Sequence, residues 1–118
     1  LELAKNLAVS IRSVEEKLGR DCIIVASSDL THYEDADTAK YLDEKILKSV
    51  EDMDIDSLIN NIVEYDITMC GYGPVITAIQ YSKLLDNHTS HVLNYSHSGM
   101  VSGDYDSVVG YTSAIIKK

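Results

Sequence analysis

The sequence predicts an α/β domain in which a mixed sheet is flanked by helices. Two observations support this class: amphipathic segments with helical spacing are interspersed with short apolar runs rich in β-branched residues, and no repeat or linker interrupts them. Hydrophobic residues make up 45% of the 118 residues, which is enough to build a core and argues against disorder. We therefore expect residues 1–118 to form a single folded unit.

The first third of the chain predicts a helix followed by a buried strand. Residues 2–18 place their apolar side chains on one face at helical spacing, and Gly19 is a suitable helix stop. Residues 22–26 form a continuous apolar run with β-branched side chains, which is typical of a strand buried on both faces in a parallel sheet. Cys22, at the start of this run, is expected in the core. Residues 27–35 are polar and are expected to form a loop.

Three further helices are predicted in the middle of the chain. Amphipathic spacing predicts the first of them over about residues 36–52. Asp54 or Asp56 can cap the second, because a short acidic side chain accepts hydrogen bonds from the first free N–H groups of a helix. Pro74 suits the first position of the third, where its missing N–H costs nothing.

Two predicted strands, at residues 91–96 and 108–116, complete the chain and flank a polar loop. Three strands under four helices make a thin sheet, and the strand at 22–26 needs neighbours on both sides. We expect these neighbours to come from the rest of a larger layered α/β domain or from a second copy of the chain. The start at Leu1, without an initiator methionine, agrees with the expectation that the chain is half of such a domain.

Charge and composition exclude several classes of partner. The formal net charge of −9 argues against a protein that binds nucleic acid by neutralising phosphates. No apolar run approaches the roughly 20 residues that span a bilayer, so we expect no membrane partner. Two cysteines are too few for a disulfide scaffold, and they suit a reducing cytoplasm.

The densest group of reactive side chains follows the predicted strand at 22–26. Ligands of α/β sheets bind at this edge, and a tight turn can direct Asp29 and His32 into one crevice. An imidazole is a good ligand for zinc, iron or copper, and a carboxylate can ligate the metal or orient the imidazole. The alternative is that Ser27, Ser28 and Asp29 simply cap a turn.

A second group surrounds Cys70, which lies just before a predicted helix. The helix dipole favours an anionic thiolate there, and Gly71 and Gly73 allow the backbone to approach a ligand closely. The alternative is a buried, inert cysteine beside an ordinary cap. A nucleophilic triad of Cys70, His32 and Asp29 is formally available, although the close spacing of His32 and Asp29 makes it awkward.

A third group follows the strand at 91–96. His97 and Asp104 are candidates for general acid or base, and His97 is a candidate metal ligand. The alternative is a polar loop that connects two strands.

Several segments together resemble the Memo family, in particular its archaeal members. Residues 24–33 resemble its Ala-Ser-Ser-Asp motif, which ends in a histidine, and residues 68–74 resemble its Cys-Gly motif, which ends in proline. Residues 94–98 and 103–111 resemble its C-terminal section. The resemblance covers essentially this whole chain but only the C-terminal half of the longer family members.

The resemblance implies a fold similar to the catalytic subunit of class III extradiol dioxygenases, which use non-haem iron. It implies that Cys70 occupies a metal-ligand position and that His32 and Asp29 lie in the same pocket, with His32 a ligand or an acid/base and Asp29 a base or orienting group. The N-terminal half of the same protein would supply further histidines. The pocket would also be lined by a small set of residues, namely Ser28, Gly71, Tyr72 and His97.

Three functional hypotheses follow. The first is a metal-dependent redox or dioxygenase-like enzyme, in which a thiolate beside imidazoles favours iron or copper and the substrate is unknown. The second is a non-catalytic adaptor that binds a peptide or small molecule in the same pocket. The third is a fragment without activity of its own.

Overall fold

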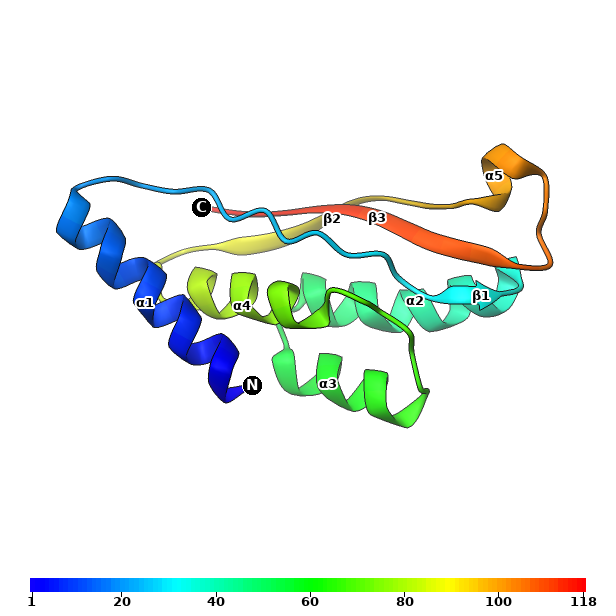
Figure 1. Ribbon diagram of the computed structural model, residues 1–118, viewed down its shortest axis with the longest axis horizontal. Coiled ribbons are helices and arrows are strands. Elements are labelled where there is room, and N and C mark those ends of the chain that lie inside the picture. The colour runs from blue at the N-terminus through cyan, green and yellow to red at the C-terminus, as the bar shows by residue number, and fades with distance from the viewer.

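The computed structural model describes residues 1–118 and has five helices and three strands (Figure 1). In chain order these are α1 (Glu2–Leu18), β1 (His32–Glu34), α2 (Ala36–Glu51), α3 (Ile55–Glu64), α4 (Tyr72–Lys83), β2 (Thr89–His97), α5 (Gly99–Ser102) and β3 (Val108–Lys117). The predicted α/β class, with helices against a sheet, is confirmed. No helix combines the length and the apolar character that crossing a bilayer requires.

The sheet has the strand order β1-β3-β2, and both pairings are antiparallel. β2 and β3 pair along their whole length, from Thr89 opposite Lys117 to His97 opposite Gly110. The other edge of β3 is paired only near its start, where His32 lies opposite Val109. Beyond Gly110 this edge of β3 has no partner strand.

The predicted strand at residues 22–26 is wrong. Residues 21–29 make no backbone–backbone hydrogen bonds, and the side chains of Ile23 and Val25 are 91% and 86% exposed. Cys22, which we expected in the core, is also exposed. The reason is that a strand forms only by pairing with its neighbours, and pairing with β3 begins only at Leu30, whose N–H donates to the carbonyl of Gly110.

The helices match their predicted positions closely. α1 has the expected bounds, and α2 and α3 begin after Asp35 and Asp54, whose carboxylates accept from the backbone N–H groups of Thr38 and Ser57. α4 begins two residues earlier than predicted, with Pro74 still inside the first turn. The short β1 and α5 both lie within segments that we expected to be loops.

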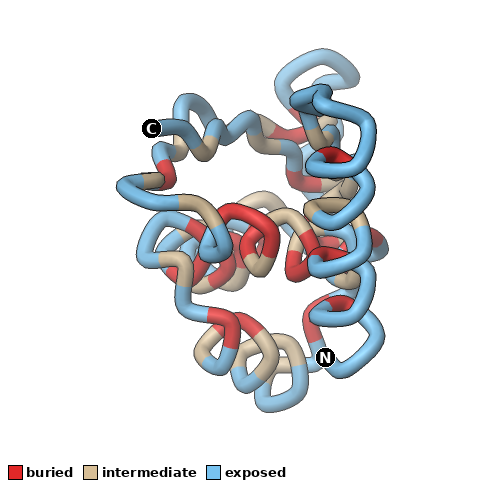
Figure 2. Tube along the Cα trace, turned by 90° about the vertical axis from the view of Figure 1, so that its left-hand side faces the viewer, coloured by how far each residue is buried: buried red, intermediate tan, exposed pale blue.

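The core lies between the helices and beneath the sheet. α2 contacts all three strands on one side and α3 on the other, whereas α1 packs against α4 (Figure 1). Figure 2 shows buried residues concentrated where the helices face one another. The central cluster draws on all four long helices and on the connecting segments, and comprises Ala4, Leu30, Ile46, Val50, Ile55, Leu58, Ile67, Met69, Ile76 and Ile79.

A buried carboxylate joins α1 to α4. Glu15 accepts a hydrogen bond of 2.6 Å from the Tyr81 hydroxyl and one of 2.8 Å from the backbone N–H of Cys22. The bond from Tyr81, followed by the bond from Cys22, holds the pKa of Glu15 below its usual value. Burial, and then the neighbouring Glu15 carboxylate, raises the pKa of Tyr81 far above the ordinary range.

The lowered pKa of Glu15 predicts acid-sensitive docking of α1. Its carboxylate stabilises the fold fully above the unfolded-state pKa of about 4.3, and this contribution is lost as the pH falls through the lower folded-state pKa. The Glu15→Gln variant keeps a hydrogen-bond acceptor but cannot titrate. Urea unfolding measures how much the free energy of unfolding falls between pH 6 and pH 3. This fall should be smaller for the variant than for the unsubstituted protein, and equal falls would show that Glu15 does not make the docking of α1 acid-sensitive.

Candidate metal centre

Asp29, His32 and Cys70 form one cluster, in which a ligand atom from each residue lies within 4.8 Å of the others. The Asp29 Oδ2 and His32 Nε2 atoms are 3.7 Å apart. Asp29 lies in the segment that leads into β1 and His32 is the first residue of β1, whereas Cys70 comes from the turn before α4. The fold thus joins two groups of candidate residues that are about forty positions apart in the sequence.

Thr68 fixes the orientation of His32. Its hydroxyl Oγ1 accepts from the His32 backbone N–H at 2.8 Å, and its carbonyl oxygen lies 2.7 Å from His32 Nδ1. Because a carbonyl oxygen can only accept, Nδ1 carries the hydrogen, and in the neutral ring Nε2 keeps its lone pair. The nitrogen that faces Asp29 is therefore the one available to a metal.

Sequence reasoning missed this role of Thr68. The only signal was its position two residues before Cys70 in the same motif. A threonine at this position is neither a typical metal ligand nor an acid or base, so its role becomes visible only when the fold places it against His32.

The sulfur of Cys70 lies against the backbone of Asp29. Sγ accepts from the Asp29 N–H at 3.3 Å, and Gly71, the next residue, is the N-cap of α4. Cys70 is exposed rather than buried, so its thiol is open to a ligand. These contacts place a soft sulfur donor beside the imidazole and the carboxylate.

Gly71 allows the two turns to touch. A Cβ at this position would collide with the carbonyl oxygen of Ser27 and lie 2.5 Å from the Ser28 Cβ. Its backbone N–H instead donates to the Ser28 hydroxyl at 2.8 Å, and this hydroxyl donates to the Asp29 carbonyl at 2.7 Å. At Gly73, by contrast, a Cβ would meet open space, so the close approach expected of both glycines involves only Gly71.

Tyr33 marks strained backbone next to the cluster. Its φ of 65° lies in the left-handed region, which an aromatic residue rarely adopts, and it lies in β1 where the register with β3 shifts, between His32 and Glu34. Its side chain is 80% exposed, and its ring centroid lies 5.9 Å from that of His32. Such strain is typical of functional sites, where the surrounding structure holds it in place.

The three remaining candidates, Tyr72, His97 and Asp104, are not part of this cluster. Asp104 is exposed in the loop after α5, where its carboxylate accepts a hydrogen bond of 3.0 Å from the backbone N–H of Asp106. Tyr72 is the first residue of α4, directly after the Cys70–Gly71 turn, and its side chain is half exposed. His97 is buried at the end of β2, packs edge-to-face on Tyr105 with 5.0 Å between ring centroids, and is not part of the three-residue group.

The arrangement favours metal binding over nucleophilic catalysis. A nucleophilic triad needs one imidazole nitrogen on the thiol and the other on the carboxylate. Here Nδ1 of His32 is engaged by the Thr68 carbonyl, and Nε2 faces Asp29. Sulfur, nitrogen and oxygen donors that converge in this way suit iron, copper or zinc better than magnesium or calcium.

The Gly71→Ala substitution tests the contact between the two turns. The added methyl group has no room, so we expect a loss of about 1–3 kcal/mol in the free energy of unfolding, together with disruption of the cluster. Gly73→Ala is the matched control, because it lies in open space within α4 and should stabilise the helix by about 0.5–1 kcal/mol. Urea unfolding measures both, and equal effects of the two substitutions would contradict the packing argument.

Comparison with known proteins finds similarity along nearly the whole chain. The family described as Memo-like protein matches residues 1–115. A MEMO1 family protein of Methanobrevibacter smithii is 44% identical over 117 residues, which are 99% of this chain and 42% of that protein. A MEMO1 family protein of Methanocaldococcus jannaschii is 40% identical over 98% of this chain and 40% of its own length.

A more distant relative shows the same pattern of coverage. A MEMO1 family protein of Methanopyrus kandleri is 35% identical over the whole of this chain and 42% of its own length. The chain thus spans about two fifths of the length of these relatives. Since the family match extends over nearly every residue described above, the chain belongs to the Memo-like protein family.

Proposed function

We propose that this chain contributes His32, Cys70 and Asp29 to a non-haem metal centre that takes iron or copper. The observation that supports this proposal is the convergence of the three donor atoms within 4.8 Å. A thiolate and an imidazole together suit these metals, and a carboxylate can complete or orient the set. The hydrogen bond from Nδ1 to the Thr68 carbonyl supports the same role, since metal-binding histidines usually donate their second nitrogen in this way.

The reaction class that we propose is a redox or dioxygenase-like conversion of a substrate not yet known. The metal, when bound, would supply Lewis acidity and a site for electron transfer. Asp29 has a partly exposed carboxylate beside His32, so it can accept a proton from a substrate hydroxyl. Tyr33 and Tyr72 both expose aromatic rings near the cluster, where they can contact a substrate.

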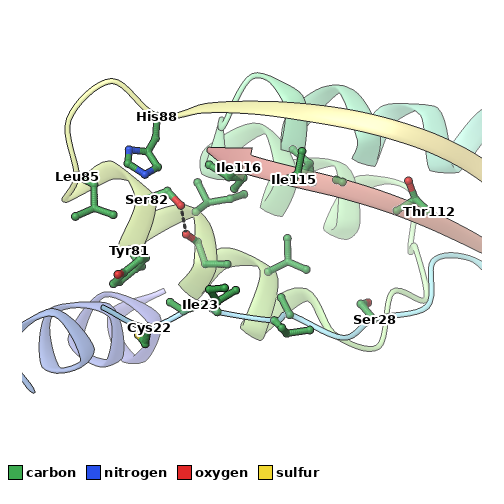
Figure 3. A pocket seen from close by; sticks show the side chains of 18 of the residues that line it. Cys22, Ile23, Ser28, Tyr81, Ser82, Leu85, His88, Thr112, Ile115 and Ile116 are labelled. Atoms are coloured by element: carbon green, nitrogen blue, oxygen red, sulfur yellow. Dashed lines mark hydrogen bonds between the residues drawn. The ribbon is translucent and has the colours of Figure 1, made fainter. Parts of the chain in front are cut away.

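We also propose that the rest of the protein packs into an apolar groove beside this centre. The groove has a volume of about 810 Å³, and 18 of its 25 lining residues are hydrophobic. Figure 3 shows Ile23 and Ile116 on opposite sides of it. One side is the unpaired segment 21–29 and the other is the free edge of β3, so both sides offer backbone groups to an added strand.

The length of the relatives supports an occupant from the same protein. The matched region is only 40–42% of each relative described above, so most of each relative lies outside it. A strand from that part would bury Ile23 and Val25 and pair both free edges. Ser28 lines the groove as well as contacting Gly71, so the added part would lie next to the metal centre and could contribute further histidines.

The metal proposal predicts that Cys70 is needed for metal binding. In the protein at its full natural length, Cys70→Ala should lose most of its bound iron or copper, measured by elemental analysis after purification. Cys22→Ala is the matched control, because Cys22 is the other free cysteine and lies outside the cluster. A Cys70→Ala variant that retains as much metal as the Cys22→Ala variant would rule out Cys70 as a ligand.

The groove proposal predicts that Ile23 is buried in the protein at its full length. Ile23→Asp should then cost about 3 kcal/mol or more, because it would bury an unpaired charge. Val63→Asp is the control, since Val63 is 76% exposed on α3 away from the groove. It should cost no more than about 1 kcal/mol, the effect of an acidic side chain in the last turn of a helix. Thermal or urea unfolding measures the loss of stability in each variant. If Ile23→Asp costs as little as Val63→Asp, Ile23 is not buried and the groove stays open.

A further inference from the structure

The side chain of Asp43, in the middle of α2, is completely buried without a cation beside it. Its exposed fraction is 0%, and none of the ion pairs in the structure includes it. An ionised carboxylate is costly to bury, and an apolar side chain of similar size would be cheaper at this depth. The presence of a carboxylate here therefore calls for a role that an apolar residue cannot fill.

Three hydrogen bonds surround this carboxylate. Oδ1 accepts from the backbone N–H of Thr31 at 2.9 Å and from the Thr31 hydroxyl at 2.6 Å. Oδ2 accepts from the Tyr95 hydroxyl at 2.6 Å. Burial, followed by the bond to Asp43, raises the pKa of Tyr95, so this hydroxyl keeps its proton and donates.

β3 leaves space for the carboxylate. A Cβ at Gly110 would collide with Asp43 Oδ2 and lie 3.1 Å from the Tyr95 hydroxyl oxygen, so only glycine fits there. The backbone of Gly110 also pairs with the segment before β1, accepting from Leu30 and donating to the Thr31 carbonyl, both at 2.9 Å. Thr31 is thus held by α2 through its amide and side chain and by β3 through its carbonyl.

Thr31 directly precedes His32, and two of the three bonds to Asp43 come from Thr31. We propose that Asp43 is a positioning residue for His32, acting through Thr31. It fixes the backbone from one side while Thr68 fixes the His32 amide and ring from the other. Together these bonds direct Nε2 toward Asp29 and Cys70. That loss of Asp43 weakens metal binding rests on the proposed metal centre. That it changes the orientation of the His32 imidazole does not.

The experiment compares four variants of the protein at its full natural length. Asp43→Leu removes every acceptor, and Asp43→Asn keeps an oxygen for Thr31. Tyr95→Phe removes only the bond to Oδ2. Asp35→Ala removes the N-cap of α2, so it weakens the same helix without touching this network. Cobalt(II) titration by absorbance and ¹⁵N NMR of the His32 imidazole in the metal-free protein are the two readouts.

We expect Asp43→Leu to weaken cobalt binding about 10- to 100-fold, as loss of a group that supports a metal ligand usually does. In the metal-free protein it should convert the single Nδ1–H tautomer of His32 into a mixture. Asp43→Asn should restore most of the affinity, and Tyr95→Phe should retain it. Asp35→Ala should lower the melting temperature while leaving both readouts unchanged.

Two results would overturn the proposal. The first is that Asp43→Leu leaves both the cobalt affinity and the His32 tautomer unchanged. The second is that Asp35→Ala loses as much cobalt affinity as Asp43→Leu, because both losses would then reflect only the lower stability of α2. If the unsubstituted protein binds none of cobalt, iron and copper, the metal proposal fails, and the tautomer measurement alone then decides the role of Asp43. If Asp43→Leu does not fold, Thr31→Val replaces it. That variant removes only the hydroxyl bond and should shift both readouts in the same direction by less.

Discussion

The candidate centre depends on the close approach of two turns. One turn contains Ser28 and Asp29, at the end of a segment without strand partners, and the other contains Cys70 and Gly71, at the start of α4. The Gly71 N–H donates to Ser28, and the Asp29 N–H donates to the sulfur of Cys70, so the turns share hydrogen bonds as well as surface. The bonded residues are 41 and 43 positions apart in the sequence, and the residues between them include α2 and α3. The packing of those two helices therefore sets whether the donors meet, although neither helix supplies a donor to the cluster.

The sequence predicts the helices well, because each carries local signals. Asp35 and Asp54 cap helices with their own side chains, and apolar spacing marks which face is buried. Residues 22–26 show where local signals are insufficient. Their composition suits a strand, but strand formation depends on partners that lie elsewhere in space. β1 is not predicted for the related reason that His32 and Glu34 are paired by residues of β3 more than seventy positions later.

The same distinction separates the parts of the site. Asp29, His32 and Cys70 are chemically conspicuous, so a sequence suggests them, and the family resemblance adds that they share a pocket. Thr68, Asp43 and Gly110 have ordinary chemistry, and their roles depend on which atoms they face. Tyr33 belongs with them, since a left-handed aromatic residue in a register shift leaves no mark on composition or spacing. The residues that orient a site are in this sense harder to predict than the residues that act in it.

The edge of β3 beyond Gly110 has a further consequence for how this polypeptide behaves when nothing covers it. Unpaired N–H and C=O groups along a strand are a template for any other extended chain, including another copy of the same one. Ile115 and Ile116 on this strand supply apolar side chains, while only Lys117 and Lys118, at its far end, carry like charges that repel a second copy. When this edge is uncovered it can pair with the same edge of another copy. The chain can then aggregate before a metal site forms.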